Sequence, residues 1–162
     1  MNGKSGMAPV CLSEASRPVP PYCLDTDGRE GTMTPGETVE AFMAAFTRGE
    51  PARAAELAAD DIVYDNIGIG ATSFESIVST INGRQAMLVF LAPLRDVEWV
   101  IHHQFSSGNM VINERRDKMA SGGVRIDVPV LGVFEVVDGK ITMWRDYSDM
   151  RTLTEQMAGS AT

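Results

Sequence analysis

Histidine, cysteine and basic residues are scarce in this chain of 162 residues, and each shortage argues against a class of function. The sequence holds only 2 His and 2 Cys, and cysteines without a nearby histidine make a poor zinc site. Lys and Arg number 14 against 22 Asp and Glu, which gives a net charge of −8. Such a composition argues against nucleic-acid binding and offers no basic stripe to an anionic membrane.

Long apolar runs are also missing. No segment approaches the roughly 20 apolar residues that cross a bilayer, and the N-terminus lacks the apolar stretch of a signal peptide. We therefore expect a cytoplasmic protein that does not enter membranes. Cys11 and Cys23 both lie in the N-terminal segment, and we expect free thiols because a reducing cytosol disfavours disulfides.

The first 33 residues contain Gly, Ser and Pro without periodicity, which predicts a flexible N-terminal leader over residues 1–33. This leader is either an extension or the result of a start codon placed too early, since Met33 directly precedes the first helix signal. Residues 34–162, with an ordinary 44% of hydrophobic residues over the whole chain, are predicted to form one domain with a hydrophobic core.

Helix signals dominate the first half of this domain and strand signals the second half. Thr34, Pro35 and Glu37 form the pattern of a capping box at the start of a helix that Gly49 can end. Further helices are predicted over 51–59, 83–91 and 150–157, and strands over 62–66, 97–105, 110–119, 124–136 and 141–147. Residues 67–82 are predicted to form a long loop, and Gly132 a bulge or bend. This order predicts an α+β fold in which helices cover one face of a curved mixed sheet.

Three polar stretches interrupt the strand-like segments: residues 64–66, 113–117 and 144–147. Because residues i and i+2 of a strand share a face, Arg115 and Asp117 should lie together. By the same spacing Tyr64 lies beside Asn66, and Trp144 beside Asp146. If these faces converge, one pocket holds two carboxylates, a guanidinium, a phenol and an amide, which is a set suited to acid–base chemistry.

Spacing alone leaves structural interpretations open for these residues. Arg115 and Asp117 could form a surface ion pair of little energetic value, and Asp146 could pair with Arg145 or Arg151. Tyr64 and Asn66 could be a buried tyrosine and a strand-end amide without a catalytic role. Three other residues, Asp65, Glu114 and Arg116, alternate away from the polar face, and Asp65 is expected to be solvated. A regular strand would turn either His102 or His103 inward, as a core residue rather than a metal ligand.

The order of elements and the motifs resemble the limonene-1,2-epoxide hydrolase family, within the cone-shaped NTF2-like and SnoaL-like superfamily. The resemblance covers roughly residues 34–157. It rests on Tyr64-x-Asn66, on Glu114-Arg115-x-Asp117, on Leu131-Gly132-Val133-Phe134, and on the stretch from Gly139-Lys140-Ile141-Thr142 to Trp144-Arg145-Asp146-Tyr147.

The resemblance implies an epoxide hydrolase that adds water to a hydrophobic epoxide in one step, giving a vicinal diol without a covalent intermediate. By motif, Asp146 resembles the base that deprotonates water, and Tyr64 and Asn66 resemble the residues that hold this water. Asp117 resembles the acid that protonates the epoxide oxygen, and Arg115 the bridge between the carboxylates. Neither a metal nor an organic cofactor is implied, and a homodimer is expected.

An apolar pocket is expected around these residues. The candidate wall residues lie on the first helix and on the strands near the polar cluster: Met43, Phe46, Met119, Val128 and Val130. Two departures from the family concern this pocket. The segment after Asn66 looks longer than is usual. Ser148, the sixth candidate wall residue, stands where an aromatic residue is frequent, and the smaller side chain would either enlarge the pocket or loosen it.

Two other functions compete with hydrolysis. An isomerase or cyclase of the same superfamily would use a single carboxylate with a partner that holds an oxyanion, and the paired aspartates argue against it. A non-catalytic binding or dimerisation module would fill the pocket with its own side chains, and its polar cluster would be dispensable.

Overall fold

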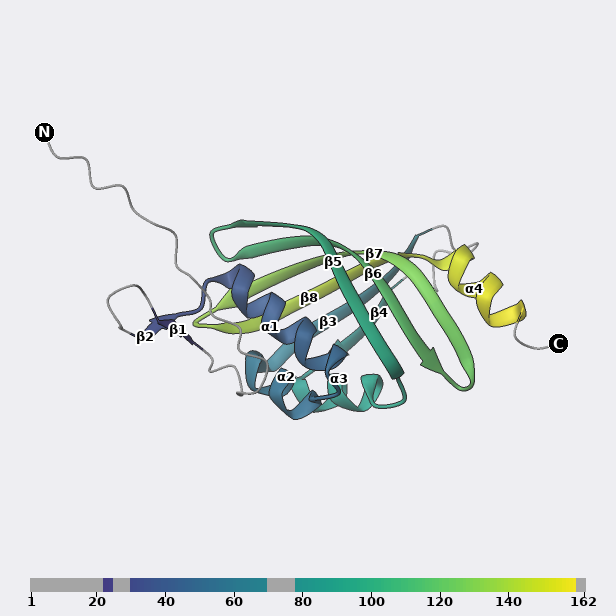
Figure 1. Cartoon of the computed structure of the whole chain (residues 1–162), viewed down its shortest axis with the longest axis horizontal. Coiled ribbons are helices and arrows are strands. Elements are labelled where there is room, and N and C mark those ends of the chain that lie inside the picture. Colours follow the sequence, from purple (N-terminus) through teal and green to yellow (C-terminus); the bar gives the residue numbers. More distant parts are fainter. Residues whose placement is uncertain (1–21, 25–29, 70–77, 160–162) are drawn as a thin grey trace, which may run out of the picture.

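The computed structural model describes residues 22–24, 30–69 and 78–159 (Figure 1). Within these ranges the helices are α1 (Pro35–Thr47), α2 (Pro51–Leu57), α3 (Arg84–Leu91) and α4 (Met150–Gly159). The main sheet contains β3 (Ala58–Ile69), β4 (Val78–Asn82), β5 (Arg95–Ser107), β6 (Met110–Ser121), β7 (Val124–Val137) and β8 (Lys140–Asp149). Two short antiparallel strands, β1 (Tyr22–Leu24) and β2 (Glu30–Thr32), lie in the segment predicted as a leader. Cys11 and most of residues 1–29 lie outside the described ranges.

The main sheet has six strands in the order β4-β3-β8-β7-β6-β5. β3 runs parallel to β8 and the other neighbours are antiparallel, so the sheet is mixed. In Figure 1 the sheet is curved, α1, α2 and α3 cover one face, and α4 lies at the far end of the molecule. We call the covered face the inner face. The predicted α+β fold is confirmed. None of the helices in the described part of the chain is long and apolar enough to span a bilayer.

The predicted capping box starts α1. The Thr34 hydroxyl accepts a hydrogen bond from the backbone N–H of Glu37 at 3.3 Å, and the Glu37 carboxylate accepts one from the backbone N–H of Thr34 at 2.7 Å. Both contacts satisfy donors that a helix start leaves free. The buried face of α1 then packs against the sheet through Val39, Phe42 and Met43. The cap therefore sets where the helix begins, and the apolar stripe sets which side meets the sheet.

Trp144 of β8 lies at the centre of the core between α1 and the sheet and is fully buried. Its ring stacks on Tyr64 with centroids 4.1 Å apart and meets Phe42 edge-on at 5.4 Å. Phe134 and Trp99 approach it at 5.9 and 5.8 Å. Aromatic contacts from α1, β3, β5 and β7 thus hold the inner faces of these elements together, and this arrangement fixes the strand residues beside Trp144.

Two predicted element boundaries were wrong. Both described ends of the expected loop over residues 67–82 are strand, because β3 continues to Ile69 and β4 pairs with it from Val78 to Asn82. Gly and Ser/Thr residues suggested a loop, but β4 is the edge of the sheet, where polar residues are common. Residues 70–77 of the expected loop lie outside the described ranges. The second helix ends at Leu57 rather than Ala59, because Ala58 already pairs with Ile141 of β8.

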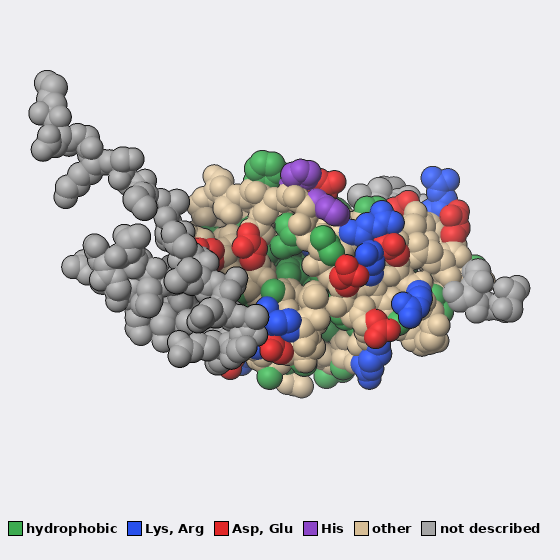
Figure 2. All heavy atoms as spheres, viewed as in Figure 1, with side chains coloured by type: hydrophobic (Ala, Val, Ile, Leu, Met, Phe, Trp, Pro, Cys, Tyr) green, Lys and Arg blue, Asp and Glu red, His purple; other side chains and the backbone are tan. Residues whose placement is uncertain are grey.

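Two further expectations about strand regularity were also wrong. Gly132 pairs in unbroken register with Asn113 and Asp146, so it forms no bulge. The register of β5 instead shifts between Ile101 and His103. Both histidines are therefore exposed on β5, where a regular strand would have turned one of them inward. Figure 2 shows the histidine side chains at the surface, and Nδ1 of His103 lies 2.9 Å from a carboxylate oxygen of Glu114.

Candidate active site

Successive side chains of β6 point to opposite faces of the sheet. Asn113, Arg115 and Asp117 are buried on the inner face, with 0, 1 and 4% of their surface exposed. Glu114 and Arg116 between them are exposed, as the alternation predicted. The interpretation of Arg115 and Asp117 as a surface ion pair is therefore wrong.

The register of the sheet brings the three predicted polar stretches together. Asn66 of β3 lies opposite Asp146 of β8, Asp146 opposite Gly132 of β7, and Gly132 opposite Asn113 of β6. The next row across the inner face consists of Gly68, Ser148, Val130 and Arg115. Cross-strand neighbours on one face lie about 4.5–5.5 Å apart. Residues separated by up to 80 positions in sequence thus become neighbours in one site.

Arg115 bridges the two aspartates. Its Nε donates to Oδ1 of Asp117 at 2.8 Å, and its Nη2 lies 2.6 Å from Oδ2 of Asp146. The three side chains are 0, 5 and 7% exposed in these pairs. Burying charges in this way is costly unless their partners are well placed, and a planar guanidinium can meet two carboxylates at once. Asp146 pairs here and not with Arg145, which instead pairs with Asp65 at 2.9 Å.

Asp146 receives further hydrogen bonds from its own strand and from β3. The indole Nε1 of Trp144 donates to Oδ1 at 2.6 Å, and the Tyr64 hydroxyl donates to Oδ2 at 3.4 Å. Asn66 Nδ2 in turn donates to the Tyr64 oxygen at 2.8 Å. The five predicted catalytic residues therefore form one connected network.

The two carboxylates lie in different environments. Burial raises the pKa of Asp117 to about 6, an effect that Arg115 opposes and Asp146 increases. Burial also raises the pKa of Tyr64 well above its ordinary value, and the negative charge of Asp146 adds to this. For Arg115, burial lowers the pKa, but Asp146 and Asp117 outweigh this, so that its pKa is raised. The raised pKa of Asp117 therefore lets a share of its carboxyl stay protonated near neutral pH, while Arg115, Trp144 and Tyr64 contact the carboxyl group of Asp146.

Four of the predicted wall residues lie on the inner face around and beyond the triad. Val130 is the register neighbour of Arg115, and Val128 that of Asp117. They form an apolar cluster with Ile126, against which Met119 and Leu153 of α4 pack. Ser148 is buried beside Val130. The triad thus lies between this cluster and the Trp144 core.

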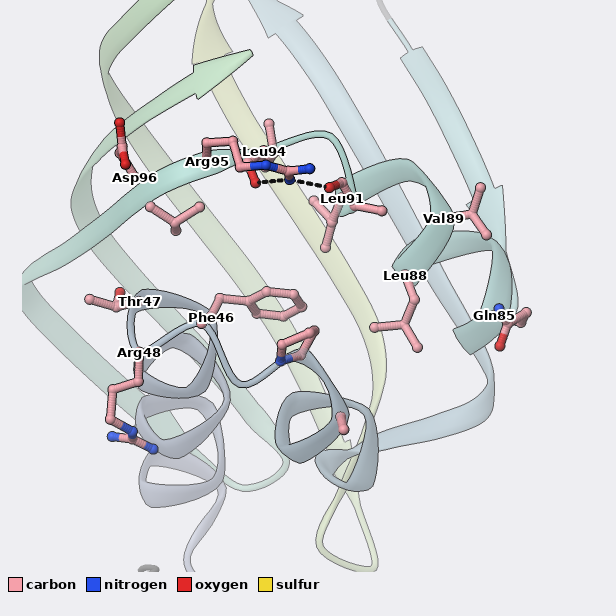
Figure 3. A pocket seen from close by; sticks show the side chains of 15 residues that line it. Phe46, Thr47, Arg48, Gln85, Leu88, Val89, Leu91, Leu94, Arg95 and Asp96 are labelled. Atoms are coloured by element: carbon pink, nitrogen blue, oxygen red, sulfur yellow. Dashed lines mark hydrogen bonds between the residues drawn. The ribbon is translucent and has the colours of Figure 1, made fainter. Parts of the chain in front are cut away.

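The two predicted wall residues on α1 lie on the other side. Met43 is buried in the core and lines a small surface recess. Phe46 lines a cavity of about 840 Å³ between the end of α1, α2, α3 and the start of β5. In Figure 3 Phe46 and Leu88 point toward each other across it. Phe46 also contacts Trp99 at 5.1 Å between ring centroids, and Trp99 is the register neighbour of Asp117. One layer of aromatic side chains therefore separates this cavity from the triad.

Sequence reasoning missed several contacts at the site. Asp65 was expected to be solvated but is buried, because Thr80 of β4 and Arg145 bond its carboxylate. The role of Trp144 as a donor to Asp146 and that of Asn113 as an acceptor from Arg115 follow from the same i, i+2 spacing, which could have revealed both. Gly132 carried no such signal. In the described part of the chain, no three His, Cys, Asp or Glu side chains gather as metal ligands.

A family model of the limonene-1,2-epoxide hydrolase catalytic domain matches residues 33–159. The chain belongs to this family. It is 34% identical over 116 residues to the epoxide hydrolase EphG of Mycobacterium tuberculosis, covering 69% of this chain and 71% of that protein. Among solved structures, an LEH-like epoxide hydrolase of M. tuberculosis superposes with a TM-score of 0.65 and 31% identity, over 78% of this chain and 90% of that one.

More distant structures share the fold of this family member. A protein from Catenulispora acidiphila with a ketosteroid isomerase-like fold superposes with a TM-score of 0.62 at 23% identity, over 77% of this chain and 95% of that one. A SnoaL-like polyketide cyclase from Shewanella putrefaciens reaches 0.64 at 14% identity, over 80 and 99%. These neighbours place the limonene-1,2-epoxide hydrolase family member in the NTF2-like fold, as expected from its sequence.

Proposed function

We propose that this protein is an epoxide hydrolase that adds water to a hydrophobic epoxide and gives a vicinal diol. The observation that carries this proposal is the bridge of Arg115 between two buried carboxylates, Asp117 and Asp146. Opening an epoxide develops an alkoxide, which is a poor leaving group. Protonating that oxygen while deprotonating water avoids both a free alkoxide and a free hydroxide.

Asp146 acts as the general base in this mechanism. Its carboxylate takes a proton from water while the water oxygen attacks an epoxide carbon and the ring C–O bond breaks. Tyr64 and Asn66 hold the water together with Asp146, which the chain of contacts from Asn66 through Tyr64 to Asp146 supports. Trp144 and Arg115 keep the carboxylate oriented from the other sides.

Asp117 acts as the general acid. Its raised pKa of about 6 keeps a share of its carboxyl protonated near neutral pH, and this proton goes to the epoxide oxygen as the ring opens. With Asp117 protonated, Arg115 and Asp146 balance each other and the cluster is neutral overall. After turnover Asp146 carries the proton and Asp117 is ionised, so one proton must return from Asp146 to Asp117, directly or through water.

A hydrophobic substrate suits the apolar surfaces on both sides of the triad. Val128, Val130 and Met119 flank it on the sheet, with Ser148 as the small residue beside them. On the helix side, Met43 and Phe46 form part of the apolar layer beside the triad.

We also propose that the protein forms a homodimer through the outer face of the sheet. Phe105, Ile112 and Leu131 are exposed there by 72, 42 and 44%, and Phe105 lies opposite Ile112 in the register. A second copy offers the same three exposed apolar side chains, so the two outer faces can bury each other around a two-fold axis. Sedimentation should give a dimer for the wild type and a monomer for Ile112→Lys.

A single-turnover reaction in oxygen-18-labelled water tests the reaction and its mechanism together. Enzyme in excess is mixed with limonene oxide, cyclohexene oxide or styrene oxide, and the diol is analysed by mass spectrometry. Direct attack by water predicts labelled diol in the first turnover and no label in the protein. Attack by a carboxylate instead predicts unlabelled diol and a labelled aspartate. Ligand-induced thermal stabilisation without any diol would favour a binding module.

A further inference from the structure

The guanidinium of Arg115 contacts three different side chains, and only two of them are carboxylates. The third contact runs from Nη1 to Oδ1 of Asn113 at 3.1 Å. We propose that Asn113, in the space provided by Gly132, is a positioning residue that fixes the guanidinium in the plane from which it reaches both aspartates. The inference rests on the proposed function, which assigns to Arg115 the role of bridging the two catalytic aspartates.

The chemistry of Asn113 suits this task. Its side chain is fully buried, and its Nδ2 has no hydrogen-bond partner among the described residues. A buried, unpaired N–H costs about 1–3 kcal/mol, which an apolar side chain at this position would avoid. The amide is therefore explained by the oxygen that it offers to Arg115. Because this acceptor is neutral, it holds the third arm of the guanidinium without adding a negative charge to the cluster.

Gly132 supplies the room for this arrangement. It lies on β7 opposite Asn113 and Asp146 in the register. A Cβ at this position would overlap with Nη1 of Arg115 and Oδ1 of Asn113. The backbone of Gly132 has no positive φ that would demand a glycine. The close approach of the guanidinium is therefore the reason for a glycine here.

The surroundings of the triad define what a change at Asn113 can perturb. The titratable groups that face Asp117 and Asp146 are Arg115 and Tyr64. The neighbours from the other packed elements are uncharged: Trp99 of β5, Val128 of β7, Phe42 of α1 and Trp144 of β8. A carboxylate introduced at position 113 would therefore act directly on the triad, with no other cation on the described inner face to compensate for it.

Three variants test the inference: Asn113→Leu, Asn113→Asp and Gly132→Ala, with Glu114→Gln on the exposed face of β6 as the control. Asn113→Leu and Gly132→Ala should lower kcat about 10- to 100-fold with little change in KM, as expected for a small displacement of a catalytic group. Asn113→Asp keeps an acceptor but adds a charge, so the high-pH limb of its kcat profile should move to higher pH. Glu114→Gln should keep the wild-type kcat and profile.

A second measurement keeps the inference testable apart from diol formation. Carbon-13 NMR titration measures the pKa of the Asp117 carboxyl in the wild type and in Asn113→Asp. This pKa should be higher in Asn113→Asp than in the wild type. If the wild type forms diol but Asn113→Leu keeps its kcat and pH profile, the inference is overturned and the proposed function stands. If the wild type forms no diol, the proposed function fails, and an unchanged Asp117 titration in Asn113→Asp would overturn the inference as well.

Discussion

The two faces of β6 carry similar residues in opposite environments. On the inner face, Arg115 pairs with Asp117 and Asp146 at 2.8 and 2.6 Å, and none of the three side chains is more than 7% exposed. On the outer face, Arg116 pairs with Asp127 at an equally short 2.6 Å, but the two side chains are 47 and 46% exposed. Distance therefore does not separate the two kinds of pair, and burial does.

Burial matters because charges removed from water interact more strongly and cost more to place. An exposed pair contributes about 0–1 kcal/mol and can be changed with little effect. A buried bridge needs each partner, and its carboxyl groups can hold protons at unusual pH values, as the raised pKa of Asp117 indicates. The inner face of β6 is therefore the one suited to proton transfer.

The largest difference between the faces is expected in activity. Asp146→Asn should lower kcat by about 10³-fold or more, because it removes the proposed base while keeping the shape of the side chain. The outer-face control Asp127→Asn should stay within about twofold. Diol formation and circular dichroism of both variants provide the check. A folded Asp146→Asn variant with substantial activity would refute the role of Asp146.

The next effect concerns the bridge itself. Arg115→Lys should lower kcat about 10²-fold, because a single ammonium group cannot meet both carboxylates in one plane. It should also lower the free energy of unfolding by about 3 kcal/mol, since it leaves buried acceptors unpaired. Arg116→Lys on the outer face should change stability by less than about 0.5 kcal/mol. Urea denaturation of both variants makes the comparison, and equal losses would contradict it.

A third difference is pH dependence of stability. The ordinary pKa of 3.8 for an Asp rises to about 6 for Asp117 in the folded protein, so the folded state binds more protons between these values. Stability should therefore fall as pH rises through this window, by about 3 kcal/mol from this group. Asp117→Asn should lack this component, and Asp127→Asn should keep it. Unfolding midpoints of the wild type and both variants are measured from about pH 4 to pH 7. Identical pH slopes for the wild type and Asp117→Asn would contradict the assignment of the raised pKa to Asp117.

The sequence predicted the inner face of β6 well and some of its surroundings poorly. Local patterns sufficed where chemistry and spacing coincide, as in the alternation of Arg115 and Asp117 and the capping box at Thr34. Gly132 was interpreted as a bulge or bend, because nothing in its own neighbourhood reveals that Arg115 comes close to it across the sheet. Asp65 was expected in solvent, because its partner Thr80 lies on a strand that the sequence did not predict. Contacts that depend on register between distant strands were thus the ones missed.

The smallest effect concerns the outer pair alone. A double-mutant cycle of Arg116→Gln and Asp127→Asn should give a coupling energy below about 1 kcal/mol, because both side chains are about half exposed and water competes for their charges. This coupling should vanish near 1 M salt, where the screening length is about 3 Å. The same cycle for Arg115→Gln and Asp117→Asn should give a larger coupling that salt barely changes, because ions and water do not reach a pair that is 0 and 5% exposed. Equal couplings with equal salt dependence would mean that the inner pair is solvated in solution, and the argument for proton transfer on that face would lose its physical basis.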